Sequence, residues 1–386
     1  MSATSALDAA SALDAAEALD ALASSDPALP GLAVVLDAEA LGRAFGEPVR
    51  IHRVRYKPGT SVIAAIESSA GRQWVAAYAN GDKVRVSTER SRWARLLDGV
   101  PFATTGPART DRALASAVRD LEKRAPEAMT DAGILRHNPG RRLVLATADR
   151  RILKVSAHDV SAAVEAGESL RAAGVPVLPT RRLSAQASDT PLWGRGDLGE
   201  NPDAAGARLA GAALAAVHAA AMPPTLPVTD ARADAEAAMR AVSTLMPQWA
   251  HRSRRVAEHA VRARRDDGAS VFVHGDFSAD QVLVGGHGEI RLIDFDRAGA
   301  GDPARDLASF AVDEALRASS ARVGAPLISP LLDGYREAGG VAAEEDWRRW
   351  VPLAALMRAV EPFRRCDADW PSGIDRALTL AEQEMS

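Results

Sequence analysis

The chain has 386 residues, of which 47% are hydrophobic and 25% are charged. This composition is typical of an ordinary globular protein, and the length corresponds to about two or three folding units. The 47 Lys and Arg residues nearly balance the 51 Asp and Glu residues, which gives a net charge of −4. Because no general basic character is present, we expect neither a nucleic-acid-binding nor a membrane-binding protein.

The N-terminal 30 residues contain three similar hexapeptides, the first of which is Ser5-Ala-Leu-Asp-Ala-Ala10. Residues 5–22 carry acidic side chains and have neither a cationic start nor a long apolar run, so a signal peptide or membrane span is not expected. A period of six places successive leucines about 240° apart on a helix. We therefore expect residues 1–30 to form a mobile or loosely docked helical arm. The single cysteine, Cys366, agrees with a cytoplasmic protein.

The segment from Val49 to Val86 alternates apolar and polar residues and contains turn signals at Pro58-Gly59 and Asn80-Gly81. This pattern predicts a small β-sheet. The following residues, 112–123, have helical spacing.

A second series of strands is predicted at 134–147 and 151–156, and its turn at Pro139-Gly140 resembles the turn at Pro58-Gly59. The two Arg-x-x-Pro-Gly turns lie 81 residues apart (Arg55 and Arg136). The similarity indicates a duplicated β-unit, although a shared turn sequence could also arise by chance. Only the second series has a lysine, Lys154, in its third strand.

After Lys154, Asp159 is a candidate N-cap for a helix that runs to about Ala173. A further strand pair is expected at 180–183 and 191–193, and the polar segment 194–203 reads as a connection between lobes. Beyond it, the spacing predicts helices, interrupted by a single hairpin.

The hairpin is the most informative stretch. Residues 282–284 and 290–293 are short apolar strands joined by a glycine-rich turn, which brings Asp276, Gln281 and Asp294 to one end. Oxygen donors grouped in this way suit Mg²⁺, and the remaining aspartate could act as a base. Downstream, Asp302 fits the N-cap of a helix, because Pro303 is favoured at the first helical position.

Taken together, three ordered motifs resemble the aminoglycoside phosphotransferase family. The resemblance covers about residues 130–385 and implies an α/β (α+β) protein with a two-lobed protein-kinase-like fold. The motifs are His274-Gly275-Asp276 with Gln281 five positions on, Ile293-Asp294-Phe295-Asp296, and Gly301-Asp302-Pro303 with Asp306. The expected parts are the arm at 1–30, a β-rich cap subdomain at 31–130, a β-rich nucleotide-binding N-lobe at 131–196, and a mostly helical C-lobe at 197–386.

The resemblance also implies residue roles. Asp276 would be the catalytic aspartate beside the acceptor hydroxyl, Asp294 the metal carboxylate, and Lys154 the lysine that binds the nucleotide phosphates. Glu165, or alternatively Glu168, would form an ion pair with Lys154. Structural support is expected from His274 as a packed loop residue, from Asp296 and Asp302, and from Asp306 bonding the catalytic loop.

The sequence departs from the family at two places. In the family, asparagine is common at the position of Gln281. Glutamine at this position resembles the maltokinase and glucosamine-kinase branch. The resemblance implies that Gln281 is the second metal ligand. No Gly-x-Gly-x-x-Gly loop precedes Lys154, so the turn at 138–142 would have to cover the phosphates, with Arg141 and Arg142 supplying charge.

These features predict an ATP- and Mg²⁺-dependent kinase that phosphorylates a hydroxyl of a small polar acceptor such as a sugar, amino sugar or aminoglycoside. The sequence leaves two alternatives open: a nucleotide-binding pseudokinase, favoured by the two departures, and a scaffold in which the duplicated β-unit binds a partner.

Overall fold

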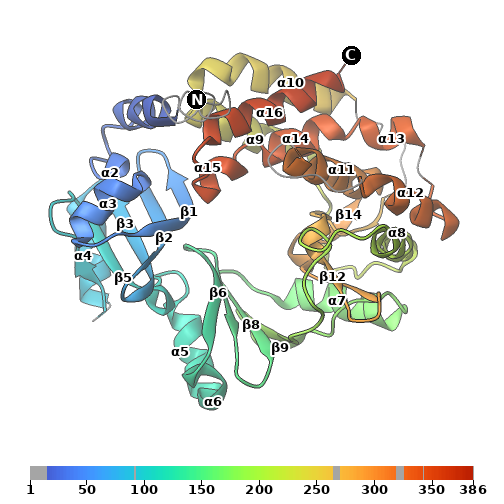
Figure 1. The fold of residues 1–386 in the computed structure, drawn as a ribbon, viewed down its shortest axis with the longest axis horizontal. Helices are drawn as coiled ribbons and strands as arrows, with labels where there is room; N and C mark the ends of the chain where they lie inside the picture. Colours follow the sequence, from blue (N-terminus) through green and yellow to red (C-terminus); the bar gives the residue numbers. More distant parts are fainter. Residues whose placement is uncertain (1–14, 91–92, 264–269, 319–325, 342, 386) are drawn as a thin grey trace, which may run out of the picture.

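The computed structural model describes residues 15–90, 93–263, 270–318, 326–341 and 343–385. Figure 1 shows a ring of three parts: a first β-sheet with its helices, a second β-sheet, and a large group of helices. The order of the elements confirms the predicted α/β class, with β-rich parts first and a mostly helical part last. None of the described helices is both long and apolar enough to cross a lipid bilayer.

Part of the N-terminal arm is packed against the protein. Residues 1–14 lie outside the described residues, but residues 15–25 are helical. Ala15 and Leu22 lie two helical turns apart and are 8% and 3% exposed. Residues 15–25 thus agree with the docked-helix alternative of the predicted arm, because Ala15 and Leu22 share one buried face.

The first sheet is entirely antiparallel, with strand order β1-β2-β3-β5-β4. Helices α2 (Leu32–Leu36) and α3 (Ala38–Phe45) precede the sheet, and α2 packs on it. The turn after β1 has Gly59 at φ +61°, a conformation that glycine adopts without steric cost. The strands are β1 (Arg50–Lys57), β2 (Ser61–Ser68), β3 (Gly71–Tyr78), β4 (Arg95–Leu96) and β5 (Ala103–Pro107).

The predicted sheet does not extend to Val86, because residues Gly81–Arg90 form helix α4. The Asn80 side chain accepts a hydrogen bond from the backbone N–H of Asp82 at 3.2 Å, which favours a helical start. Val84 is 9% exposed and packs in a small cluster with Trp74 and Tyr78 of the sheet. Tertiary packing thus outweighs the strand-like alternation of this segment.

The second sheet repeats the architecture of the first. Its strand order, β6-β7-β8-β10-β9, matches the first sheet position by position, and helix α7 (Ser161–Ala172) follows its third strand as α4 follows β3. The short helices α5 (Ala115–Arg124) and α6 (Pro126–Thr130) connect the sheets. The strands are β6 (Gly133–Asn138), β7 (Arg142–Ala146), β8 (Arg151–Ser156), β9 (Arg181–Ser184) and β10 (Ala187–Pro191).

The strand registers also match. Lys154 lies opposite Val144 and Ser188, and Ala76 lies opposite the corresponding positions in the first sheet, Ile63 and Thr104. Ala76 is 1% exposed. The position of Lys154 is therefore occupied in the first sheet by a small buried residue that carries no charge.

The helical part surrounds two short strand pairs, β11 with β14 and β12 with β13. These strands hold the hairpin and its flanking loops in place, and α8 packs against both β11 and β13. The strands are β11 (Val271–Val273), β12 (Val282–Val284), β13 (Ile290–Leu292) and β14 (Gly299–Gly301). The helices are α8 (Ala204–Ala219), α9 (Ala231–Leu245), α10 (Ala250–Arg262), α11 (Ala304–Ala318), α12 (Ile328–Glu337), α13 (Glu344–Arg348), α14 (Val351–Arg358), α15 (Glu361–Arg365) and α16 (Trp370–Gln383).

Strand β1 closes the ring, since it lies beside both β6 and α15 (Figure 1). The Arg55 guanidinium donates to the carbonyl oxygen of Gly140 at 2.8 Å, and Arg53 forms an ion pair with Glu361 at 2.9 Å. The rings of Tyr56 and Phe363 meet edge to face. The first sheet therefore contacts the second sheet and the helical part at once.

Candidate active site

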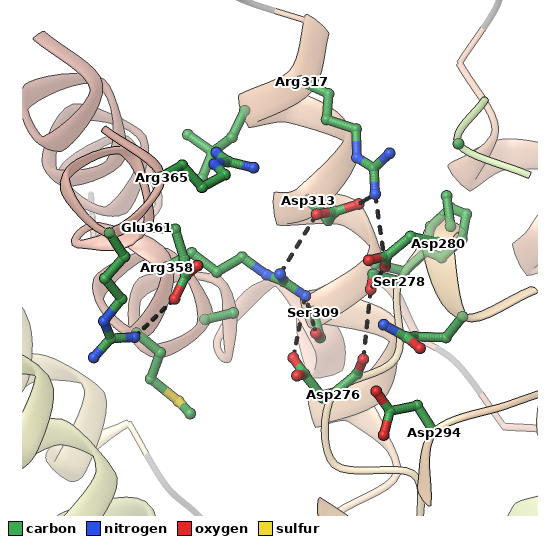
Figure 2. Close-up of a pocket in the computed structure, with 18 of the residues that line it drawn as sticks. Asp276, Ser278, Asp280, Asp294, Ser309, Asp313, Arg317, Arg358, Glu361 and Arg365 are labelled. Carbon is green, nitrogen blue, oxygen red and sulfur yellow. Dashed lines mark hydrogen bonds and ion pairs between the residues drawn. The ribbon is translucent and has the colours of Figure 1, made fainter. Parts of the chain in front are cut away.

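Asp276 lies in a tight loop directly after β11. Gly275 has φ +81°, and a Cβ atom there would lie 2.1 Å from the carbonyl oxygen of Arg297. Only glycine fits at this position, because any side chain would collide with backbone. The Asp276 side chain is 43% exposed and lines the main pocket (Figure 2).

The buried carboxylate of Asp306 holds this loop from helix α11. Its two oxygens accept the backbone N–H groups of His274 and Gly275 at 2.7 and 2.8 Å, and His218 Nε2 lies 3.2 Å away. Burial opposes ionisation, but these bonds, with His218 first, hold the pKa of Asp306 below its usual value. The other ring nitrogen of His218, Nδ1, lies 2.8 Å from the hydroxyl oxygen of Tyr335.

His274 is fully buried between Phe277 and Phe295. Its Nε2 lies 2.9 Å from the carbonyl oxygen of Ile293, the residue before Asp294. His274 thus connects the loop of Asp276 with the strand end that carries Asp294, which is the contact expected of a packed loop residue.

Asp294 lies where β13 ends, with φ +65°, one of four positive values among the described non-glycine residues. Aspartate tolerates this left-handed conformation better than most residues. Its Oδ1 pairs with Lys154 at 2.8 Å and its Oδ2 with Arg142 at 3.0 Å. Burial favours the neutral form, but Lys154 and Arg142 outweigh it and keep the pKa of Asp294 well below its usual value.

Asp296 completes this charge cluster. Its Oδ2 lies 2.6 Å from Lys154 Nζ and 3.3 Å from Arg142. Lys154 and Arg142, which come from adjacent strands β8 and β7, therefore each contact both carboxylates.

The expected ion pair between Lys154 and Glu165 is not formed in this structure. Among the described residues, Lys154 pairs with Asp294 and Asp296, whereas the Glu165 carboxylate accepts a hydrogen bond from Thr225 at 2.8 Å. No ion pair joins Glu168 to Lys154 in the described part of the chain either. In this structure the partners of Lys154 are therefore Asp294 and Asp296, which follow β13, and not a glutamate of helix α7.

The residues expected to hold a metal line the same pocket, namely Asp294 and Gln281. The backbone of Gln281 is fixed by its carbonyl oxygen, which accepts the N–H of Ile293 at 3.1 Å. Within the described residues, no group of three or more His, Cys, Asp or Glu side chains is arranged as a metal site. One carboxylate and one amide oxygen nevertheless fit Mg²⁺, which takes few protein ligands and completes its shell with water and phosphate oxygens.

The two arginines at the end of the turn between β6 and β7, Arg141 and Arg142, have different surroundings. Arg142 reaches Asp294 and Asp296, whereas Arg141 lines the pocket without an ion pair to any described residue. Asp302 supports helix α11, because it accepts the N–H of Ala304 at 2.9 Å. The carboxylate of Asp302 also binds two side chains of the α13–α14 region, Arg349 and Trp350.

The pocket has a volume of about 1260 Å³ and is lined by all three parts of the ring. This volume exceeds the range of about 300–1,000 Å³ typical of small-molecule sites, so it has room for two ligands. Sequence reasoning missed the arginines that face Asp276. Arg358 lies 3.5 Å from its carboxylate and also donates to Ser309 at 2.9 Å (Figure 2). Arg297 lies 3.7 Å from the same carboxylate. Arg358 belongs to no motif and could be found only from the packing of α14.

Comparison with known sequences places most of the chain in one family. The sequence model of the phosphotransferase enzyme family (APH) matches residues 129–353, more than half of the chain. The protein therefore belongs to this phosphotransferase family. No curated protein matches the chain.

Solved structures show the same fold at low sequence identity. A choline/ethanolamine kinase family protein from Mesorhizobium loti is 18% identical, with a TM-score of 0.50, over 71% of this chain and 95% of that one. An amicoumacin kinase is 14% identical, with a TM-score of 0.53, over 72% and 94%. The choline kinase from Streptococcus pneumoniae is 12% identical, with a TM-score of 0.51, over 70% and 98%. The matches confirm the kinase-like fold of this chain.

Proposed function

We propose that the protein transfers the γ-phosphoryl group of ATP, with Mg²⁺, to a hydroxyl group of a small polar acceptor. The observation that carries this proposal is the joint placement of Asp276, Asp294 and Gln281 on one pocket, with Lys154 paired to Asp294. Phosphoryl transfer depends mainly on positioning and on neutralising charge, and this arrangement offers both.

Each residue has a distinct part in this proposal. Asp276 orients the acceptor hydroxyl and takes its proton, since it is exposed to the pocket. Lys154 and Arg142 neutralise the nucleotide phosphates, and both must first give up part of their contact with Asp294. Asp294 and Gln281 would hold Mg²⁺, which when bound bridges and neutralises the phosphate oxygens.

Two sets of contacts hold these residues in fixed positions relative to one another. Asp306 and His274 fix the loop of Asp276 to the strand that bears Asp294, so the base and the metal carboxylate keep a constant relation. The contact of Arg55 with the Gly140 carbonyl holds the turn that carries Arg141 and Arg142.

The ligands of similar folds support the nucleotide and the metal. The amicoumacin kinase was solved with AMP-PNP, Ca²⁺ and its substrate. A spectinomycin phosphotransferase, with a TM-score of 0.50, was solved with AMP. Hydroxyl-bearing small molecules are accordingly the first acceptors to try.

The proposal is tested by measuring ADP formation from ATP with Mg²⁺ and a panel of sugars, amino sugars, sugar acids and aminoglycosides. We expect at least one compound to stimulate ADP formation well above the acceptor-free rate. A pseudokinase or a scaffold would form no ADP with any acceptor, although the pseudokinase would still bind ATP.

A further inference from the structure

The acidic side chains on the helical wall of the pocket already have partners. Arg317 and Arg358 pair with Asp313, and Arg53 and Arg364 pair with Glu361. The remaining contacts are Glu314 with the backbone N–H groups of Leu327 and Ile328, Asp367 with Arg365, and Asp369 with Arg376. Among its described residues, this wall therefore presents no free carboxylate of the kind that would attract a polycationic acceptor such as an aminoglycoside.

The opposite charge is in excess where the three parts of the ring meet. We define the junction cluster as five arginines: Arg53 and Arg55 on β1, Arg141 in the turn before β7, Arg297 after Asp294, and Arg364 on α15. All but Arg55 line the pocket. The cluster thus combines side chains from the cap sheet, the nucleotide-binding lobe and the helical lobe.

Only two carboxylates form ion pairs with the junction cluster in the described part of the chain. Glu361 pairs with Arg53 at 2.9 Å and with Arg364 at 2.7 Å, and Asp276 lies 3.7 Å from Arg297. Arg55 is bound only to a backbone carbonyl, and Arg141 forms no ion pair with any described residue. Five cations therefore face two anions.

The environment of Arg141 reflects this surplus. Partial burial, together with the neighbouring guanidinium groups of Arg55 and Arg364, lowers the pKa of Arg141. In addition, the Nε of Arg53 is buried without a hydrogen-bond partner. Unpaired cationic donors in a pocket favour an anionic ligand, because charge-assisted hydrogen bonds would satisfy them.

We propose that the acceptor carries a carboxylate or phosphate group, which the junction cluster binds while an acceptor hydroxyl faces Asp276. This inference rests on the proposed function and adds the charge of the substrate. The contact of Arg297 with Asp276 places one member of the cluster beside the proposed base, and three other members line the same pocket.

The cations proposed to bind the nucleotide phosphates, Lys154 and Arg142, are not members of the junction cluster. Lys154 and Arg142 gather at Asp294 and Asp296, whereas Arg141, one residue before Arg142, lies among Arg55 and Arg364. The turn therefore separates a nucleotide side from an acceptor side, and the junction cluster belongs to the acceptor side.

The test uses calorimetry on the full chain with sulfate as the probe, at constant ionic strength. Mg²⁺ and AMP-PNP are titrated first, and sulfate is then titrated into the nucleotide-saturated protein. We expect sulfate to bind, and Arg141→Gln and Arg364→Gln each to weaken it about tenfold or more. The matched control is Arg50→Gln, an exposed arginine on β1 outside the pocket, which should leave sulfate affinity unchanged.

The outcomes separate this inference from the proposed function. Failure to bind Mg²⁺ and AMP-PNP would count against the proposed function. Normal nucleotide binding without sulfate binding would overturn only the anionic acceptor. Sulfate binding that disappears once the nucleotide is bound would also overturn it, since the arginines would then serve the nucleotide. In the turnover panel, a neutral or aminated compound with the highest kcat/KM would likewise contradict an anionic acceptor.

Discussion

The ammonium group of Lys154 lies 2.8 Å from the carboxylate of Asp294, although 140 residues separate them in the sequence. In this arrangement the lysine proposed for the nucleotide phosphates and the carboxylate proposed for the metal neutralise each other. A bound nucleotide would give Lys154 phosphate oxygens as new partners, and its Mg²⁺ would give Asp294 a new cation. The pair thus leaves neither Lys154 nor Asp294 without a partner of opposite charge.

Replacing Lys154 tests the nucleotide side of the site. Lys154→Ala should weaken Mg·ATP binding by about tenfold or more, because a charge-assisted contact with phosphate is lost. Lys57→Ala and Lys83→Ala, in the cap, should leave the affinity unchanged, since Ala76 occupies the matching register position there. Calorimetry measures all three affinities. Protection of Lys57 or Lys83 from amine labelling by ATP would contradict this division of roles.

Replacing Asp294 tests the metal side. Asp294→Ala should abolish the Mg²⁺-dependent part of ATP binding, because the carboxylate supplies the strongest proposed ligand. Gln281→Ala should have a milder effect, since an amide oxygen is neutral. Titrations of ATP with and without Mg²⁺ check both variants. Equal Mg·ATP affinity of Asp294→Ala and the unaltered protein would show that the hairpin is not the metal site.

The support of the loop of Asp276 can be tested separately. Asp306→Ala should lower both kcat and the free energy of unfolding, the latter by about 3–5 kcal/mol, because two backbone N–H groups and His218 lose a buried charged partner. Tyr335→Phe is the matched control. It removes one hydrogen bond to His218, so it should cost about 1 kcal/mol in stability with kcat nearly unchanged. Urea unfolding and steady-state kinetics measure both effects. Normal kcat in Asp306→Ala would remove its positioning role.

The contact between the first sheet and the helical part should depend on pH. Burial opposes ionisation of Glu361, but Arg53 and Arg364 outweigh it and lower the pKa of Glu361 to about 2. Because the pKa is depressed in the folded state, the contribution of Glu361 to stability is present above its usual pKa of 4.5 and is lost as pH falls toward 2.

Glu361→Gln should therefore destabilise the protein by about 1–2 kcal/mol at pH 6, and this difference should shrink as pH falls below about 4.5. Urea unfolding of both proteins at several pH values gives the measurement. A difference that stayed constant from pH 6 to pH 3 would mean that the charge of Glu361 is not the stabilising feature.

Local patterns predicted most of the strands and the hairpin because these depend on neighbouring residues. The strand expected at 191–193 instead lies at Ala187–Pro191. The turns at Gly59 and Gly140 both have positive φ, and the hairpin of β12 and β13 forms where the apolar runs indicated it. The matching strand orders and registers of the two sheets support the predicted duplication. Helix α4 was missed because Val84 and Val86 alternate like strand residues, while the packing of Val84 against the sheet is a long-range effect.

The arginines of the site could not be predicted from the sequence. Arg358 reaches Asp276 only because α14 packs against α11, and Arg53 reaches Glu361 across 308 positions of the chain. Motif spacing carries no information about such contacts. The contacts of Lys154 with Asp294 and Asp296 could not be predicted for the same reason, since both aspartates approach it from the other lobe.

Phosphoryl transfer from γ-labelled ATP under single-turnover conditions tests whether Asp276 is the base of a phosphotransferase. With an acceptor found in the panel, the unaltered protein should move the label to the acceptor. Asp276→Asn should bind Mg·ATP with nearly the same affinity but transfer the label about 10²-fold more slowly or worse, as expected when a general base is lost. Transfer by Asp276→Asn at a rate close to that of the unaltered protein would contradict the account.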